Sequence, residues 1–275
     1  MVGPTWRGIA LVALLLIPPA RAQYPGKSWE DKIIQANYAS GAHNYAQAEQ
    51  IFLQAIHEAE RFGPDDTRLG TTLAGIGAVY RAEKKFAEAE EALRRAAGIF
   101  EDAHGEESAD VGDADYKLAG ALTDEGKYAA ALPLLEKSLR IYERGNGPND
   151  PQTASVLCTI GDTHRALKSW AEAESPLKRC AEIREANGGL VNAELGDAVN
   201  SLAVVYMHEG KYATADSEFK LAEKIREKTL GITSPLFADT LEAHAAMLRQ
   251  LGRDEEAAKD AALAAAIRRR EKKTN

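Results

Sequence analysis

The sequence predicts an all-α protein built as a solenoid of about six antiparallel helix pairs. Three observations support this fold class. Aromatic residues make up only 7% of the 275 residues while alanines occur in runs, a composition that favours closely packed helices over sheets. A set of residue types recurs about every 42 residues. Within each recurrence, apolar residues are spaced by three, four and seven positions, which is the spacing of one helical face.

The first 22 residues are predicted to be a signal peptide. Arg7 precedes an apolar run of about ten residues, which is half the length that a helix needs to span a bilayer. A Pro-Pro pair then interrupts any helix, and the triplet ending at Ala22 has the small-x-small pattern of a signal-peptidase site, with cleavage between Ala22 and Gln23. We therefore expect a periplasmic or secreted protein, with no stable membrane insertion of the mature chain.

The charge of the expected mature chain is acidic. Removing Arg7 and Arg21 takes the formal charge from -8 to -10, because residues 1–22 contain no acidic residue. An acidic surface disfavours nucleic acid and anionic membranes as partners, since both are polyanions. The basic stretch at 268–273 is a local exception. It is either a solvated helix end whose cations complement the helix dipole or a contact for a polyanion.

A turn is predicted inside each unit at a polar residue that is followed, in five of six cases, by an aromatic one. The residue before this pair is Gly126, Gly210 or Gly252 in three units, and Lys84 or Lys168 in two. An alanine follows three residues after the aromatic position in every unit, where it allows two helices to touch. The pairs are Asn44-Tyr45, Lys85-Phe86, Lys127-Tyr128, Ser169-Trp170, Lys211-Tyr212 and Arg253-Asp254.

The end of each unit is marked by a glycine, expected to form a left-handed cap of the longer second helix. In the first unit, the distance from Tyr38 to Tyr45 exceeds that from Tyr206 to Tyr212 by one residue, which predicts an insertion in the first turn. The closing glycines are Gly63, Gly105, Gly147, Gly189 and Gly231. The expected organisation is a signal peptide at 1–22, a lead-in at 23–30, a solenoid at 31–270 with units at about 31–66, 67–108, 109–150, 151–192, 193–234 and 235–270, and a basic tail at 271–275.

This pattern resembles the tetratricopeptide repeat, and specifically its 42-residue variant in kinesin light chains and many bacterial proteins. The residues that carry the resemblance are the stripe 202–206 (LAVVY), the turn 210–215 (GKYATA), the second helix 222–227 (AEKIRE) and the closing pair 230–231 (LG). The match covers about 31–270. The resemblance implies a right-handed superhelix whose first helices line a concave surface that holds a peptide or partner helix.

Catalytic and metal motifs are not found in the sequence. The repeated GKYATA turn lacks the flanking glycine and preceding strand of a phosphate-binding loop. The six histidines form no H-x-H or H-x-x-x-H pair, so no metal site is predicted. We therefore expect a protein that is not an enzyme and that binds no cofactor.

Two cysteines lie within one unit. Cys158 and Cys180 are each 11 residues from position 169 in the expected hairpin, which places them at the same height. An exported chain with two thiols is consistent with a disulfide, and two buried thiols packing as small apolar residues are the alternative. The sequence does not decide between them.

The resemblance places the partner-binding surface on the first helices. The side-chain ladder of asparagines typical of kinesin-type relatives is reduced to Asn200, and the carboxylate clamp of chaperone-binding relatives is not reproduced. Arg81, Arg165 and Arg249 recur every 84 residues, so they could meet an acidic peptide or could pair with carboxylates of the same chain. The candidate groove residues are Arg81, Tyr116, Lys117, Thr159, Asp162, Arg165, Asn200, Met207, His208, Glu242 and Arg249.

The expected function is an exported protein–protein interaction scaffold that binds a peptide or helical segment of a partner protein. The identity of that partner is not specified by the sequence. The alternatives are an enzyme-associated regulator and a solenoid that binds cell-wall carbohydrate. Only Tyr116 among the groove residues offers a stacking ring for a sugar.

Overall fold

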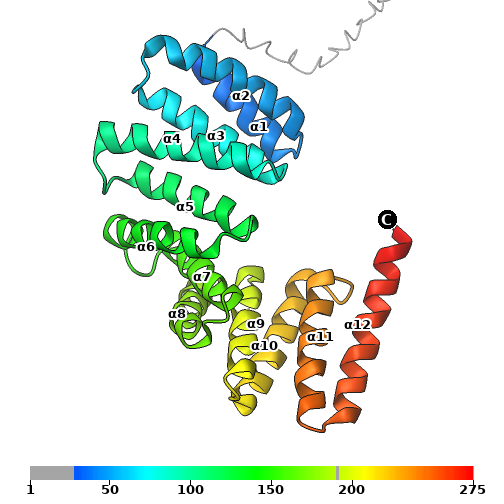
Figure 1. Ribbon diagram of the computed structural model, residues 1–275. Coiled ribbons are helices and arrows are strands. Elements are labelled where there is room, and N and C mark those ends of the chain that lie inside the picture. The colour runs from blue at the N-terminus through cyan, green and yellow to red at the C-terminus, as the bar shows by residue number, and fades with distance from the viewer. Residues whose placement is uncertain (1–27, 190–191, 275) are drawn as a thin grey trace, which may run out of the picture.

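The computed structural model describes residues 28–189 and 192–274, and every regular element in them is helical. The helices follow one another as six antiparallel pairs along an arc that runs from α1 and α2 to α12 (Figure 1). The predicted all-α solenoid is thereby confirmed. The predicted signal peptide, with its cleavage site at Ala22 and Gln23, lies outside the described residues. The helices are α1 Trp29–Gly41, α2 Tyr45–Ala59, η1 Glu60–Phe62, α3 Thr67–Ala82, α4 Phe86–His104, α5 Ala109–Asp124, α6 Tyr128–Gly145, α7 Pro151–Ala166, α8 Trp170–Gly188, α9 Ala193–His208, α10 Tyr212–Leu230, α11 Pro235–Gln250 and α12 Asp254–Thr274.

Side-chain caps fix the start of the first helix in each of five pairs. A serine, aspartate or asparagine at the N-cap accepts a hydrogen bond from a backbone N–H in the first turn, which otherwise has no partner. The sixth first helix, α11, begins with Pro235, which is suited to the first helical position. The capping residues are Ser28, Asp66, Ser108, Asp150 and Asn192.

The turns inside the pairs use a positive φ at the position predicted from the sequence. Gly126 and Gly210 have φ of 87° and 75°, and Lys84 and Lys168 adopt φ of 61° and 60° at the same register. A residue with a Cβ is strained there by about 1–2 kcal/mol. The prediction of an insertion in the first turn is wrong. The turn between α1 and α2 has the same length as the turn between α3 and α4, and His43, with φ 57°, occupies the position that Lys84 has in the second unit.

The first unit is instead shortened in its second helix. The helix α2 ends at Ala59 and continues as the 3-10 turn η1, so its closing glycine comes one residue early relative to the turn. Ala39 is buried at the position of Tyr206, whereas Tyr38 is 79% exposed. The closing glycines Gly105 and Gly231 have positive φ of 85° and 81°, the conformation for which glycine was predicted, but their ψ of 156° and 163° lie outside the left-handed helical region.

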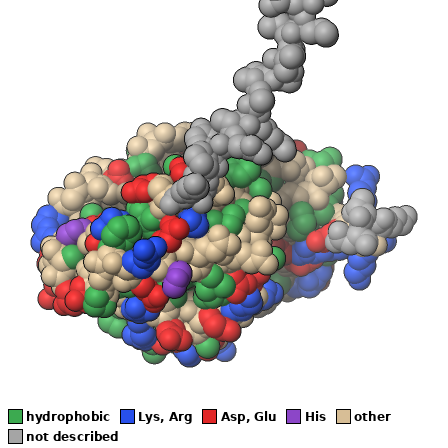
Figure 2. Space-filling model, turned by 90° about the horizontal axis from the view of Figure 1, so that it is seen from above, with side chains coloured by type: hydrophobic (Ala, Val, Ile, Leu, Met, Phe, Trp, Pro, Cys, Tyr) green, Lys and Arg blue, Asp and Glu red, His purple; other side chains and the backbone are tan. Residues whose placement is uncertain are grey.

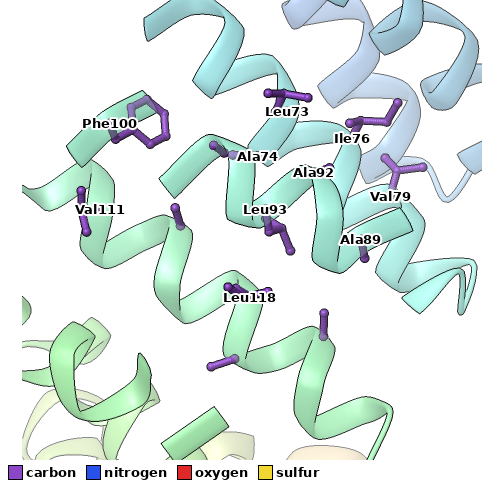
Figure 3. Packing of buried hydrophobic residues seen from close by; sticks show 14 of the residues in the cluster. Leu73, Ala74, Ile76, Val79, Ala89, Ala92, Leu93, Phe100, Val111 and Leu118 are labelled. Carbon is purple, nitrogen blue, oxygen red and sulfur yellow. The ribbon is translucent and has the colours of Figure 1, made fainter. Parts of the chain in front are cut away.

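The core is continuous between neighbouring pairs and is built on small residues. Figure 3 shows Ala89 and Leu93 of α4 between α3 and α5, where both side chains are fully buried. Gly77 on α3 allows this close packing, because a Cβ there would lie 2.6 Å from Cγ of Leu93. Burial of such a leucine contributes about 1.5–3 kcal/mol. Each pair therefore depends on its neighbours for its stability.

The lysine of the repeated turn links consecutive units. Nζ of Lys211 lies 2.7 Å from the carboxylate of Glu174 on the preceding second helix and 3.0 Å from that of Glu209. The same ammonium lies 5.3 Å from the ring centroid of Tyr206. The GKYATA stretch is thus structural. Equivalent ion pairs join other units: Lys85–Glu49, Lys127–Glu90 and Arg253–Asp216.

Cys158 on α7 and Cys180 on α8 form a disulfide, with their Cα atoms 5.4 Å apart. The bond therefore joins the two helices of the fourth pair at one height.

The last pair ends in a longer helix than expected. The helix α12 continues to Thr274, so part of the predicted tail is helical. Arg268 at the start of the basic stretch pairs with Asp239 and Glu242 of α11. Three side chains of α12 are buried in the described structure, namely Ala257, Ala264 and Ile267.

Candidate functional site

The concave surface of the arc is lined by the first helix of each pair. Successive first helices contact one another, from α1 and α3 to α9 and α11, which places them on the crowded inner side of the curve. All the predicted groove residues lie on these helices, and each is partly or fully exposed. They are Arg81 on α3; Tyr116 and Lys117 on α5; Thr159, Asp162 and Arg165 on α7; Asn200, Met207 and His208 on α9; and Glu242 and Arg249 on α11.

Two of the three candidate arginines are paired with carboxylates on the same surface. Nε of Arg81 lies 2.6 Å from Oδ2 of Asp124, and Nε of Arg165 lies 3.1 Å from Oδ1 of Asp162. The side chain of Arg249 is exposed and makes no ion pair with the described residues. Pairing within the chain therefore accounts for two of these arginines, and the acidic-peptide hypothesis loses most of its support.

Tyr116 is held between two units. Its hydroxyl oxygen lies 3.4 Å from Oγ1 of Thr159, and its ring centroid lies 6.5 Å from that of Tyr142. Tyr142 donates its own hydroxyl to Asp113. Burial, together with that carboxylate, raises the pKa of Tyr142, which keeps it a neutral donor.

Contacts of this kind recur with a fixed separation. In four consecutive units, a residue of the second helix reaches over to a residue 29 positions earlier on the first helix. These bonds fix polar side chains along one edge of the concave surface. The pairs are Tyr142–Asp113, Arg184–Ser155, Arg226–Asp197 and Arg268–Asp239.

His208 stacks on the first residue of α8. Its ring centroid lies 4.0 Å from that of Trp170, with the planes 7° apart. Partial burial, and then the nearby Lys168 and Arg165, lower the pKa of His208. The imidazole is therefore a neutral hydrogen-bonding group at ordinary pH and forms part of a flat aromatic surface.

Asn200 and Met207 occupy different environments on α9. Oδ1 of Asn200 is buried and has no hydrogen-bond partner among the described residues. Met207 is partly buried against the core cluster that contains Tyr206. Neither contact identifies a ligand, so their role in partner binding stays a prediction.

A hollow of about 240 Å³ opens on the concave surface of the first three units. Its floor carries small residues, which leave room for another chain to approach. The amide of Asn37 and the ammonium of Lys117 lie in it, and neither has a hydrogen-bond partner among the described residues. Sequence reasoning placed Thr71, Ala74, Asp113 and Lys117 on this face and kept only Lys117 as a candidate site residue. It missed Asn37, because its list of groove residues began at the second unit. The lining residues are Asn37, Thr71, Ala74, Gly75, Phe100, Asp110, Asp113, Ala114 and Lys117.

A second polar cluster lies away from the concave surface, between α10, α11 and α12. His244 is 3% exposed and is surrounded by the carboxylates of Asp216, Glu223 and Asp260. Burial would raise the pKa of Asp216, but hydrogen bonds that this carboxylate accepts from Lys220, His244 and Arg253 hold its pKa at about 2. Sequence reasoning missed this cluster because it searched for ligands that are close together along the chain.

Positive and negative side chains are mixed on the face of the molecule that is seen from above, with no large region of one sign (Figure 2). No helix among the described residues is both long enough and apolar enough to cross a membrane.

Comparisons with known proteins agree with this architecture. A family model described as tetratricopeptide repeat matches residues 35–102 and 110–186, which is more than half of the chain. A search of the curated proteins found no match. Three solved structures illustrate the likeness, and at such identities they show the fold alone. The apo form of RapI has a TM-score of 0.68 and 19% identity, over 89% of this chain and 99% of that chain. A putative kinesin light chain with nearly identical TPR-like repeats from Podosopora anserina has a TM-score of 0.63 and 19% identity, over 75% of this chain and 96% of that chain. YrrB, a TPR protein with an unusual peptide-binding site, has a TM-score of 0.52 and 20% identity, over 74% of this chain and 89% of that chain.

Proposed function

Because the chain belongs to the tetratricopeptide repeat family, we propose that it is a protein–protein interaction scaffold that holds an extended segment of a partner protein on its concave surface. In this proposal the chain itself carries out no chemistry. YrrB, which has a similar fold, is described as having a peptide-binding site, and this supports the proposal.

The hollow between α1, α3 and α5 is the observation that carries the proposal. Small residues, Ala74, Gly75 and Ala114, line its floor, so no long side chain fills it from below. The side chains of Asn37 and Lys117 supply hydrogen-bond donors to that backbone, whose carbonyl groups need partners when they leave water. A carbohydrate ligand has less support, because Tyr116 is engaged with Thr159 and Tyr142.

Site-specific photo-crosslinking in the native host tests this function. A photoreactive amino acid at Asn37 or Lys117 is expected to capture the same discrete protein, and the crosslinked peptides should come from one short segment of it. The matched control is Arg140, which is exposed on the second helix α6. Capture of the same protein from Arg140, or of none from the concave positions, would contradict the proposal.

We also propose that the chain is exported, with cleavage after Ala22. The disulfide between Cys158 and Cys180 supports this, because such bonds persist in oxidising compartments. N-terminal sequencing of the protein from an envelope or culture fraction should begin at Gln23. A cytosolic protein that retains residues 1–22 would refute it.

A further inference from the structure

Each junction between consecutive units brings together three equivalent positions. One lies on the second helix of the earlier unit, one on the first helix of the later unit, and one on the later second helix. At the first and fourth junctions the side chains at these positions line a groove on the outer side of the array. In the 42-residue register the first four junctions are almost entirely apolar: Ile56, Ile76 and Ala92; Ala97, Leu118 and Leu134; Leu139, Ile160 and Pro176; Ala181, Leu202 and Glu218.

The fifth junction is polar at all three positions, whereas the fourth is polar only at Glu218 and the first three at none. It holds Glu223 on α10, His244 on α11 and Asp260 on α12. His244 occupies a place that is leucine or isoleucine in the four preceding units. Buried polar side chains lower stability unless their hydrogen-bonding and charge requirements are met. Two new polar residues beside a carboxylate, all three of types that bind metals, therefore point to a specific role for this junction.

The three side chains converge on one point. Nδ1 of His244 lies 2.7 Å from Oε1 of Glu223 and 3.3 Å from Oδ2 of Asp260, and all three atoms lie within 4.8 Å of one another. Ligands about 2.0–2.2 Å from a tetrahedral zinc ion lie about 3.3 Å from each other. Small side-chain rotations would thus place the three atoms around one ion.

The other nitrogen of the ring is already oriented for this arrangement. Nε2 of His244 lies 3.2 Å from Oδ1 of Asp216, which is itself held by Arg253 at 2.7 Å and by Lys220 at 2.6 Å. A carboxylate that accepts a hydrogen bond from Nε2 keeps the proton on that nitrogen, so that Nδ1 becomes the metal-binding nitrogen once it gives up the proton that it donates to Glu223. Histidines that bind metals are usually held in this way.

The charge of the junction also favours a cation. Two carboxylates face Nδ1, whereas the cations Arg253 and Lys220 pair with Asp216 on the opposite side of the ring. The side chains of Glu223 and Asp260 are 20% and 22% exposed, so an ion can enter from solvent and retain a water molecule. Imidazole nitrogen with carboxylate oxygen suits Zn²⁺ better than Ca²⁺ or Mg²⁺, which prefer oxygen alone.

We propose that Glu223, His244 and Asp260 form a binding site for one divalent transition-metal ion, with zinc as the expected occupant. The ion replaces the proton on Nδ1 of His244, so binding releases a proton to solvent. Because its ligands come from α10, α11 and α12, the ion joins the last pair to the fifth one. This site is separate from the concave surface and does not depend on the proposed partner-binding function.

Two measurements on the chelator-treated protein test the site. Isothermal titration calorimetry with zinc chloride measures binding, and thermal unfolding with and without zinc measures stabilisation. The expected result is one ion per chain and a thermal midpoint that rises with zinc. His244→Leu restores the residue of the other units and is expected to weaken binding by about 100-fold or more and to abolish the shift of the midpoint. Asp216→Asn should weaken binding about 10–100-fold. Substitution by Co²⁺ should give an absorption spectrum typical of a four- or five-coordinate site.

The matched control is Glu218→Ala, which removes the carboxylate at the equivalent position of the fourth junction and should leave zinc binding unchanged. Circular dichroism establishes that each variant is folded, and Glu223→Ala with Asp260→Ala provides a second test if His244→Leu does not fold. Stoichiometric binding that persists in His244→Leu, or no binding to the unaltered protein below about 100 μM zinc, would overturn the proposal.

Discussion

Arg226 on α10 donates from Nη2 to Oδ1 of Asp197 on α9 at 2.7 Å, although its own side chain is only 5% exposed. Its Nη1 also donates to the carbonyl of Leu236 and to the hydroxyl of Thr240, each at 2.6 Å. One guanidinium therefore joins both helices of the fifth pair to the first helix of the sixth.

Replacement of Arg226 by alanine is expected to lower the free energy of unfolding by about 3 kcal/mol, because the guanidinium is buried and the acceptors on α11, the hydroxyl of Thr240 and the carbonyl of Leu236, lose a charged donor. Urea denaturation measures this. The control is Arg268→Ala at the same register position, where the partners Asp239 and Glu242 are half exposed and the expected loss is about 1 kcal/mol or less. Equal losses in the two variants would contradict the interpretation.

Gly161→Ala should destabilise the protein by about 2 kcal/mol despite the better helix propensity of alanine. A Cβ at Gly161 would lie 2.4 Å from Cγ of Leu177 and 3.2 Å from its backbone nitrogen. Gly98 lies within α4 with nothing within 4 Å of a Cβ, so Gly98→Ala is expected to stabilise by about 0.5–1 kcal/mol. Thermal unfolding of both variants separates the effect of steric crowding from that of helix propensity. A Gly161→Ala variant more stable than the unaltered protein would refute the prediction of crowding against Leu177.

Reduction of the disulfide should lower stability by about 3 kcal/mol, as the chain-entropy treatment gives for the sequence separation of 22 between Cys158 and Cys180. Dithiothreitol is expected to lower the melting temperature of the unaltered protein. In a variant with both cysteines replaced by alanine, the reductant should have no effect. A melting temperature that does not respond to reduction would show that the bond contributes nothing.

The stability of the folded protein should depend on pH through Glu218, which lines the groove at the fourth junction. Burial raises the pKa of this carboxyl, so the folded state binds its proton more tightly than the unfolded state does. The resulting stabilisation is complete below the unfolded pKa and is lost as the pH rises through the folded one. Glu218→Gln should therefore raise the melting temperature at about pH 7.5 more than at about pH 4. Glu182→Gln, at an exposed position of the same groove, is the control, and an equal gain there would contradict the assignment.

The helix pairs and their turns could be predicted from the sequence because each unit repeats the same local signals. The turn lysine Lys168 takes a positive φ at the register position where other units have glycine. The pairing of Arg81 with Asp124 was left open, since its geometry depends on how consecutive first helices cross. The ligands around His244 are 16 to 28 residues away in sequence and meet only once two units have stacked. Asn37 was missed because the first unit follows the repeat least closely.

The covalent link within the fourth pair has a mechanical consequence for the array. A solenoid pulled from its two ends extends one helix pair at a time, and each released pair adds its full contour length. The loop closed by Cys158 and Cys180 cannot be drawn out, which shortens the total extension by about 75 Å at 3.4 Å per residue. The fourth pair, Pro151–Gly188, therefore extends only by the residues outside this loop, whereas the three pairs before it and the two after it can extend fully.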